Sequence, residues 1–377
     1  MKKQMTRLTA IVLAAAMTFS LAGCQTKEAP TQTTAATQAE SQTASTAETT
    51  APQTSSEAAT TASTEEAKDS FPVTITDQGG RSVTIESKPE KIVSGYYITT
   101  SLMIALGLKD QVVGIEAKAK SRPIYSLSAP EFLELPNVGS AKEFNLEACA
   151  ALEPDLVIVP LKLKDSAQAM EDLGLNVLLV NPENKELLEE TIRMVGQATG
   201  TSERAEALIA YNEEKTSELQ ESLKDVEKPT VYLAGNSSML NTAGPKMYQN
   251  TLIENGGGAN VAAELEDTYW AEVSYEQILA WDPEVIVVVP GAGYTVEDVL
   301  KDEQMAGVKA VKDKAVYQMP ADFEAWDSPV PSAVLGSLWM ACVLHGDVYT
   351  EEAFQADAKD FYQQFYDVEI DTSLLTK

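Results

Sequence analysis

Two stretches of this sequence share one pattern. Residues 145–160 read NLEACAALEPDLVIVP, and residues 274–290 read SYEQILAWDPEVIVVVP. In each, a helix-capping residue stands two positions before a glutamate, a proline stands seven positions after it, and an apolar, largely β-branched run follows. This order predicts a short helix, a stop at an acidic residue and proline, and a strand buried on both faces.

The two copies lie 129 residues apart, so the pattern indicates one α/β unit repeated in two lobes of similar size. Flanking patterns predict further strands at 73–76, 82–85, 91–94, 112–115, 177–180, 230–234 and 315–319. Helices are expected over 99–106 and through 252. Alternating strands and helices predict an α/β fold with two doubly wound lobes and parallel sheets.

Between the lobes the pattern is purely helical. One helix is expected to end near Gly200, and a second to run from Ser202 to about Lys224. At 1.5 Å per residue the second helix is about 34 Å long, enough to join the lobes as a rigid rod. The expected division is a lobe over 71–182, a helical connector over 183–228 and a lobe over 229–377.

The first 23 residues are typical of a secretory signal. Lys2, Lys3 and Arg7 precede an apolar run that is too short and too weakly hydrophobic for a membrane span. The run ends in Leu21-Ala22-Gly23-Cys24, which resembles a bacterial lipobox. That resemblance implies acylation of Cys24, with palmitate as the expected fatty acid, and an extracytoplasmic protein anchored by lipid to the bacterial membrane. The alternative is ordinary secretory cleavage beside a chance cysteine.

Residues 25–70 contain no Ile, Leu, Val, Met, Phe, Tyr or Trp, and 35 of these 46 residues are Thr, Ala, Ser or Gln. Such a segment cannot bury enough apolar surface to offset its ordering entropy. The sequence therefore predicts a disordered tether, followed by a folded body that begins at Phe71.

Composition excludes several classes of function. The chain has 28 basic and 57 acidic residues, a formal charge of −29, which argues against general nucleic-acid binding and against adhesion to anionic lipid. Three Cys and one His leave almost no material for a zinc or haem-iron centre. No nucleophile–base pair or phosphate loop is recognisable, so neither an enzyme nor a cofactor is expected. Cys149 and Cys342 read as buried thiols, with a disulfide between them left open.

Several motifs occur in a characteristic order. They are Asp77–Val83, Lys88–Val93, Leu106–Leu108 before Val112–Gly114, Asn137–Gly139, the two repeats, and Leu335–Ala341 before Leu344-His345. Behind a lipobox, this order resembles the iron-siderophore and vitamin B12 class of ABC-transporter substrate-binding proteins, the class III family with a helical backbone. The resemblance covers 71–377, with Gly346 in place of the usual proline. It implies a ligand cleft between the lobes and a monomer that carries a metal chelate, foremost an iron-siderophore, to a permease homodimer or heterodimer with its ATPase.

The resemblance assigns Glu147 and Glu276, one in each repeat, to contacts with arginines of the two permease subunits. The alternative is that each carboxylate only stabilises its own helix start, by about 0.3–1 kcal/mol.

The cleft is expected beyond the carboxyl ends of the parallel strands. The candidate ligand-binding residues there are Tyr96, Tyr97, Arg122, Tyr125, Lys142, Phe144, Lys162, Trp270, Tyr294, Phe323 and Trp326. Aromatic rings suit a bulky chelate, and the three cations suit an anionic one. The alternatives are aromatic residues that close the lobe edges and solvated surface cations. The stretch 326–331, WDSPVP, matches only part of the family and indicates no ligand.

Other functions remain open. The same receptor could serve a corrinoid, haem or an oxyanion, or the chain could be a surface sensor or adhesin that transports nothing. A receptor for free zinc or manganese needs several His ligands and is disfavoured by the single His.

Overall fold

The computed structural model describes residues 69–266 and 268–377, all within one compact unit, Ser63–Lys377. The predicted signal, Cys24 and nearly all of the tether lie outside the described residues. Within those residues, no helix combines the length and apolar character that crossing a membrane requires.

The N-terminal lobe is built on a four-stranded parallel sheet of order β4-β3-β5-β6. Its strands are β3 (Ile92–Ser94), β4 (Val112–Ile115), β5 (Leu156–Pro160) and β6 (Val177–Val180). Its helices are α1 (Tyr97–Ala105), α2 (Pro123–Ser128), α3 (Leu146–Ala150) and α4 (Lys164–Asp172).

The C-terminal lobe has a second four-stranded parallel sheet of order β12-β11-β7-β9. Its strands are β7 (Thr230–Ala234), β9 (Ala259–Asn260), β11 (Val285–Val288) and β12 (Val316–Gln318), and an antiparallel pair, β8 (Asn241–Ala243) and β10 (Trp270–Glu272), adjoins it. The helices are α7 (Tyr248–Asn255), α8 (Tyr275–Trp281), α9 (Val296–Lys301) and α10 (Lys309–Asp313). The predicted α/β fold with two doubly wound lobes is confirmed.

The two repeats have the predicted structure. Asn145 caps α3 through a bond from the Ala148 N–H, and Ser274 caps α8 through a bond from the Gln277 N–H. The residue before each proline, Glu153 or Asp282, has a positive φ of 48° or 44°. This left-handed residue ends each helix turn and directs the chain into its buried strand.

Side chains alternate between two cores along the repeat strands. In β5, Leu156 and Ile158 belong to a large core that continues into the other lobe, whereas Val157 and Val159 belong to a core of the N-terminal lobe alone. In β11, Ile286 and Val288 likewise belong to a core confined to the C-terminal lobe. The uninterrupted apolar runs are therefore explained by burial on both faces.

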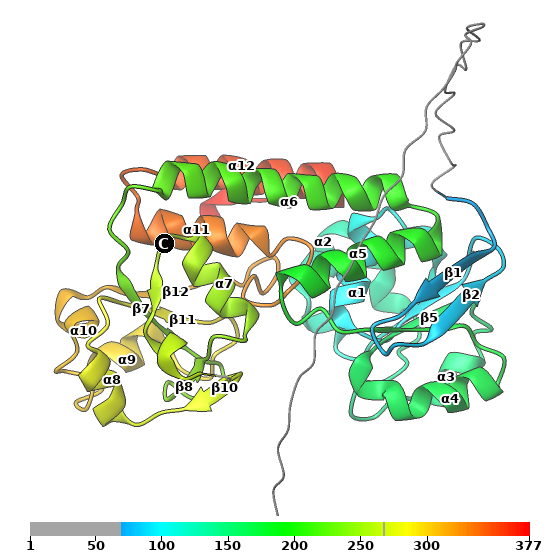
Figure 1. The fold of residues 1–377 in the computed structure, drawn as a ribbon, viewed down its shortest axis with the longest axis horizontal. Coiled ribbons are helices and arrows are strands. Elements are labelled where there is room, and N and C mark those ends of the chain that lie inside the picture. Colours follow the sequence, from blue (N-terminus) through cyan, green and yellow to red (C-terminus); the bar gives the residue numbers. More distant parts are fainter. Residues whose placement is uncertain (1–68, 267) are drawn as a thin grey trace, which may run out of the picture. The chain divides into compact units, whose positions relative to one another are not determined.

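A layer of long helices joins the lobes (Figure 1). It contains α5 (Lys185–Thr199), α6 (Ser202–Leu223), α11 (Val334–Leu344) and α12 (Glu351–Tyr366). The predicted connector helices correspond to α5 and α6, and Gly200 ends α5 with a φ of 66°. The expectation of a single joining rod is incomplete, because α12 lies alongside α6. Tyr211 of α6 packs against the rings of Phe361 and Phe365 at 5.5 Å between centroids.

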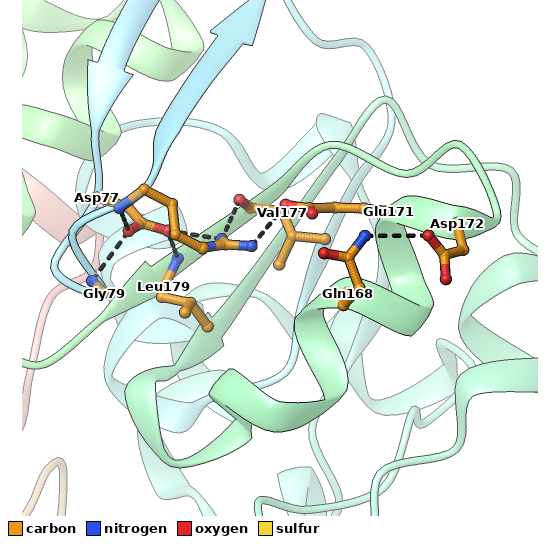
Figure 2. Close-up of polar contacts among 8 residues, drawn as sticks. Asp77, Gly79, Gln168, Glu171, Asp172, Val177 and Leu179 are labelled. Atoms are coloured by element: carbon orange, nitrogen blue, oxygen red, sulfur yellow. Dashed lines mark hydrogen bonds and ion pairs between the residues drawn. The ribbon is translucent and has the colours of Figure 1, made fainter.

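A hairpin of β1 (Val73–Thr76) and β2 (Ser82–Ile85) covers the edge strand β6. The buried Asp77 carboxylate accepts hydrogen bonds from the N–H groups of Gly79 and Leu179 and pairs with Arg81 at 2.6 Å (Figure 2). The Arg81 guanidinium also donates to the Val177 carbonyl at 2.7 Å. These contacts bind the turn to β6 and occupy backbone groups that an open sheet edge would expose.

Candidate functional site

A cavity of about 340 Å³ lies between the lobes, where the parallel strands end. From the N-terminal lobe it is lined by residues after β3 and β4, on α1 and around α2: Tyr97, Ser101, Ser121, Arg122, Pro123, Ile124 and Tyr125. From the C-terminal lobe it is lined by residues after β7, β11 and β12: Asn236, Pro290, Gly291, Ala321, Phe323, Glu324, Ala325, Asp327, Ser328 and Val330. This is the edge at which open parallel sheets bind ligands.

Arg122 and Tyr97 form one wall of the cavity. The guanidinium carbon of Arg122 lies 4.2 Å from the centre of the Tyr97 ring, a cation–π contact. The Arg122 Nε atom is buried and has no hydrogen-bond acceptor, and no carboxylate of the described residues pairs with this guanidinium. A buried donor without an acceptor costs about 1–3 kcal/mol, so a ligand acceptor beside Nε would be favoured.

Tyr125 holds α2 against the neighbouring elements. Its hydroxyl lies 3.1 Å from the Tyr97 carbonyl oxygen and 3.0 Å from Oε1 of Glu116. The other Glu116 oxygen accepts a hydrogen bond from the Thr100 hydroxyl. Burial raises the pKa of Glu116 above its usual value, although these hydrogen bonds oppose the rise. The contacts fix the position of Arg122, which immediately precedes α2.

Glu324 lines the cavity and links the lobes beneath it. Its two oxygens accept hydrogen bonds from the hydroxyls of Ser101 on α1 and Ser332 just before α11. The Tyr366 hydroxyl of α12 lies 2.8 Å from the Ser101 hydroxyl. Burial raises the pKa of Glu324, and the two serine donors oppose that rise.

Asp327 is a second acidic residue of the cavity and is only 8% exposed. Burial raises its pKa to about 6, while hydrogen bonds from Gln249 and from its own backbone oppose the rise. The adjacent Ser328 hydrogen-bonds Tyr97, and the charges of Arg122 and Asp327 act on the Tyr97 pKa in opposite directions. The cavity thus combines one guanidinium with two buried carboxyl groups.

Four of the eleven predicted ligand-binding residues line this cavity: Tyr97, Arg122, Tyr125 and Phe323. Three more lie close to it. The Tyr96 ring packs edge-on against Tyr97 at 5.1 Å. Trp270, 39% exposed, lies over Gly235, and the Tyr294 hydroxyl donates to the Gly235 carbonyl at 2.6 Å. Because Gly235 precedes the lining residue Asn236, both aromatic side chains stand at the rim.

The other four predicted residues are absent from the cavity lining. Lys142 and Lys162 are exposed, and Phe144 packs near Gly95 and lines a depression beside Glu147. Trp326 is 1% exposed, and its Nε1 donates to the Tyr362 hydroxyl at 3.0 Å. Sequence reasoning did not identify Ser101, Asn236, Glu324, Asp327 or Ser328. Position after a strand was the available signal for Asn236, and no local pattern marked the buried acids.

The two glutamates of the repeats lie outside the cavity lining. Both are exposed and stand in the first turns of α3 and α8. A hydrogen bond to its own backbone N–H and one from Ser274 lower the pKa of Glu276. In Figure 1 the two helices lie on the side of the folded body opposite α6 and α12, one in each lobe.

The side chains that commonly bind metals are scattered in the part of the chain that the structure describes. Among residues 69–266 and 268–377, no three His, Cys, Asp or Glu side chains group in a way that could hold a metal ion. Cys149 and Cys342 are both buried free thiols. The buried His345 ring lies 3.1 Å from the Gly257 carbonyl oxygen, consistent with a structural role at a helix end.

Comparison with known proteins identifies the family. The sequence profile described as periplasmic binding protein matches residues 92–323. The chain belongs to the periplasmic binding protein family. Members of this family are substrate-binding components of ABC importers rather than enzymes, which confirms the sequence-based expectations of family, binding role and extracytoplasmic setting.

Individual periplasmic binding proteins are similar over most of the folded body. The molybdate-binding protein MolA of Haemophilus influenzae is 27% identical over 319 residues, covering 78% of this chain and 90% of MolA. Its molybdate-bound structure has a TM-score of 0.70 over 79% of this chain and 99% of MolA, at 26% identity. The uncharacterized ABC transporter substrate-binding lipoprotein YvrC of Bacillus subtilis is 28% identical, covering 70% of this chain and 83% of YvrC. A periplasmic solute binding protein of Veillonella parvula has a TM-score of 0.71 over 80% of this chain and 95% of its own, at 26% identity.

Proposed function

We propose that this periplasmic binding protein captures a compact anionic metal compound in the cavity beside Arg122 and delivers it to an ABC permease. The observation that carries the proposal is the Arg122 guanidinium. It stands in a cavity between the lobes, stacks on Tyr97, and has a buried Nε without an acceptor. In a chain of formal charge −29, a guanidinium free of any carboxylate partner at a cavity favours an anionic ligand.

The size of the cavity narrows the ligand class. A volume of about 340 Å³ is near the lower end of the range of about 300–1,000 Å³ typical of small-molecule sites. A metal oxyanion fits this volume with room for water, and MolA, a molybdate-binding protein by name, resembles this chain over most of its length. The corrinoid and haem alternatives are bulkier and would require the lobes to stand further apart.

An iron-siderophore, the first expectation from the sequence, is the second candidate ligand. The rim supports it, because the exposed Trp270 ring and Tyr294 stand next to the cavity and could stack on a chelate that extends out of it. In that case Arg122 would bind the anionic part of the chelate.

Delivery is proposed to depend on a lipid anchor and on one exposed glutamate in each lobe. Cys24 would carry the lipid anchor, and Glu147 and Glu276 would meet arginines of a dimeric permease that works with its ATPase. The receptor would act as a monomer, because one exposed glutamate on each lobe can address both permease subunits. An adhesin that binds no small ligand would not require an arginine free of carboxylate partners at an interlobe cavity.

Ligand titration tests the binding proposal. Tryptophan fluorescence and calorimetry would be followed with molybdate, tungstate, a ferric hydroxamate, haem and cobalamin. We expect an oxyanion to bind best and Arg122→Ala to weaken it about tenfold to hundredfold, the loss of one charge-assisted hydrogen bond. Lys142→Ala, which removes an exposed cation outside the cavity lining, is the matched control and should bind like the unchanged protein. Tight binding of haem or cobalamin alone, or unchanged affinity in Arg122→Ala, would refute the proposal.

Cell fractionation tests the anchor. Cys24→Ala should abolish incorporation of labelled palmitate and release the protein from the membrane fraction. If the variant remains in the membrane with unchanged mobility, Cys24 is not the anchor.

A further inference from the structure

The polar groups that line the cavity are mostly hydrogen-bond donors or groups that can donate. Arg122 offers N–H groups only, and Ser121, Asn236 and Ser328 can each donate. Glu324 and Asp327 differ, because an ionised carboxylate can only accept. An anion presents acceptors to the donors, so the two acidic residues require a separate explanation.

Both carboxylate oxygens of Glu324 already have hydrogen-bond donors within the protein. Each of its oxygens accepts a hydrogen bond from a serine hydroxyl, one on α1 and one before α11. This arrangement explains Glu324 as a bridge between the lobes that the fold itself satisfies.

The protein uses fewer of the hydrogen-bond acceptor positions of Asp327. The Gln249 side chain and the residue's own backbone N–H are the donors that lower its pKa, whereas a carboxylate offers about four acceptor positions. It is 8% exposed, lines the cavity, and has no ion-pair partner among the described residues. A buried carboxylate with unused acceptor capacity at a binding cavity is costly unless the ligand supplies a donor.

We propose that Asp327 is a specificity-determining residue, whose carboxylate accepts a hydrogen bond from the ligand and so selects anions that carry an O–H or N–H group over fully deprotonated anions. The inference rests on the proposed capture of an anion beside Arg122. A ligand without a proton, such as molybdate at neutral pH, would place its own lone pairs against the ionised carboxylate and leave both unpaired, so such an anion should bind best below pH 6, where Asp327 itself carries a proton. Sites built around one such hydrogen bond reject analogues that lack it far more strongly than they reject differences in size.

A dependence on pH follows from the same geometry. Burial raises the pKa of Asp327 to about 6. Below that pH the carboxyl group carries its own proton and can donate to a deprotonated anion, so affinity for such an anion should rise as pH falls through 6. The other titratable or charged groups around it are Tyr97, Arg122 and Tyr125 on the α1–α2 side, Glu116 behind Tyr125, and Glu324 in its own segment. Burial raises the pKa values of both tyrosines, which keeps them neutral throughout this range.

The experiment compares two tetrahedral anions of similar size in calorimetry. Arsenate carries one O–H at pH 7.5, and selenate carries none. The unchanged protein should prefer arsenate at least tenfold, and Asp327→Asn should abolish or reverse that preference. Lowering the pH from 7.5 to 5.0 should strengthen selenate binding at least tenfold in the unchanged protein and leave it flat in Asp327→Asn. Asp322→Asn, an exposed residue of the same segment that does not line the cavity, is the matched control.

The outcomes distinguish the proposed role of Asp327 from the proposed capture of an anion. If both anions bind but Asp327→Asn keeps the preference and the pH dependence, the role of Asp327 is refuted while anion capture stands. If the pH dependence is lost in Glu324→Gln and kept in Asp327→Asn, the proton belongs to Glu324 and the inference is equally refuted. If neither the unchanged protein nor Asp327→Asn binds any oxyanion, the proposed capture fails, and the inference fails with it. Asp327→Ser replaces Asp327→Asn if the latter melts at a markedly lower temperature.

Discussion

The guanidinium carbon of Arg122 lies 4.2 Å from the centre of the Tyr97 ring, so the cationic residue of the cavity is held by an aromatic ring rather than by a carboxylate. An ion pair would neutralise Arg122, whereas the ring orients it and leaves its hydrogen-bonding N–H groups for a ligand. The contact joins the segment after β3 to the segment after β4, which is why both strand ends must be in place before the site exists.

Tyr97 is therefore predicted to matter through its ring. Tyr97→Ala should weaken anion binding about threefold to thirtyfold, the equivalent of a cation–π contact, because Arg122 loses its support. Tyr97→Phe keeps the ring and should bind within about threefold of the unchanged protein, losing only the bond with Ser328. Calorimetry with the best oxyanion gives both values. Equal affinity in Tyr97→Ala, or a larger loss in Tyr97→Phe, would assign the role to the hydroxyl or to neither group.

Glu147 and Glu276 are predicted to serve delivery and not binding. Changing both to Ala should leave ligand affinity unchanged, because neither lines the cavity, and should reduce cellular uptake at least tenfold. The reason is the loss of two charge-assisted contacts of about 1.5–3 kcal/mol each. Glu143→Ala with Glu272→Ala removes one exposed glutamate from each lobe nearby and is the matched control. Full uptake by the Glu147/Glu276 variant would leave stabilisation of their own helix starts as their whole role.

The repeats show why so much of the fold could be predicted. Strands β5 (Leu156–Pro160) and β11 (Val285–Val288) lie between two cores, and such strands read as short, continuous apolar runs. Their β-branched residues and the proline just before each run distinguish them from a buried helix. Helix α12 was also within reach, because Phe354, Ala358, Phe361 and Phe365 recur at helical spacing. The repeated unit ends before this segment, so the α/β pattern alone predicts no helix here.

The site was less predictable than the fold. Arg122 and Tyr97 were found because both follow strands, but the same rule also selected Trp326, which points into the core beside Phe354. The next residue, Asp327, lines the cavity instead. No periodic pattern governs this irregular segment, and acidic residues are usually exposed, so nothing local distinguished Asp327 and Glu324 from the many surface acids of this chain.

Asp327 should also affect folding stability in a pH-dependent way. A carboxyl group whose pKa is raised from 3.8 to about 6 on folding binds more protons in the folded state, so its contribution to stability falls as pH rises through that window. Between pH 4.5 and 7.5 the free energy of unfolding of the unchanged protein should fall by about 2 kcal/mol through this group. The Asp327→Asn protein lacks the titrating group and should not show this decrease. Urea unfolding at both pH values measures the difference between the two proteins. A difference that stays constant with pH would show that this carboxyl titrates normally in the folded protein.

Ligand capture is predicted to move the lobes only slightly. Helices α6 and α12 pack together through Tyr211 and an ion pair between Lys215 and Asp357 at 2.9 Å, and one core is continuous between the lobes. A tilt of a few degrees over the length of α6, about 34 Å, displaces a lobe by only about 3 Å.

Spin labels at Glu143→Cys and Glu272→Cys, in a Cys24→Ala background, would measure the distance between the lobes. The two remaining cysteines should stay unlabelled, because Cys149 and Cys342 are buried and burial raises the pKa of the Cys149 thiol to about 11. We expect a change of about 3 Å or less on saturation with ligand. A contraction on the order of 10 Å would show hinge closure, which would require α6 and α12 to bend or separate.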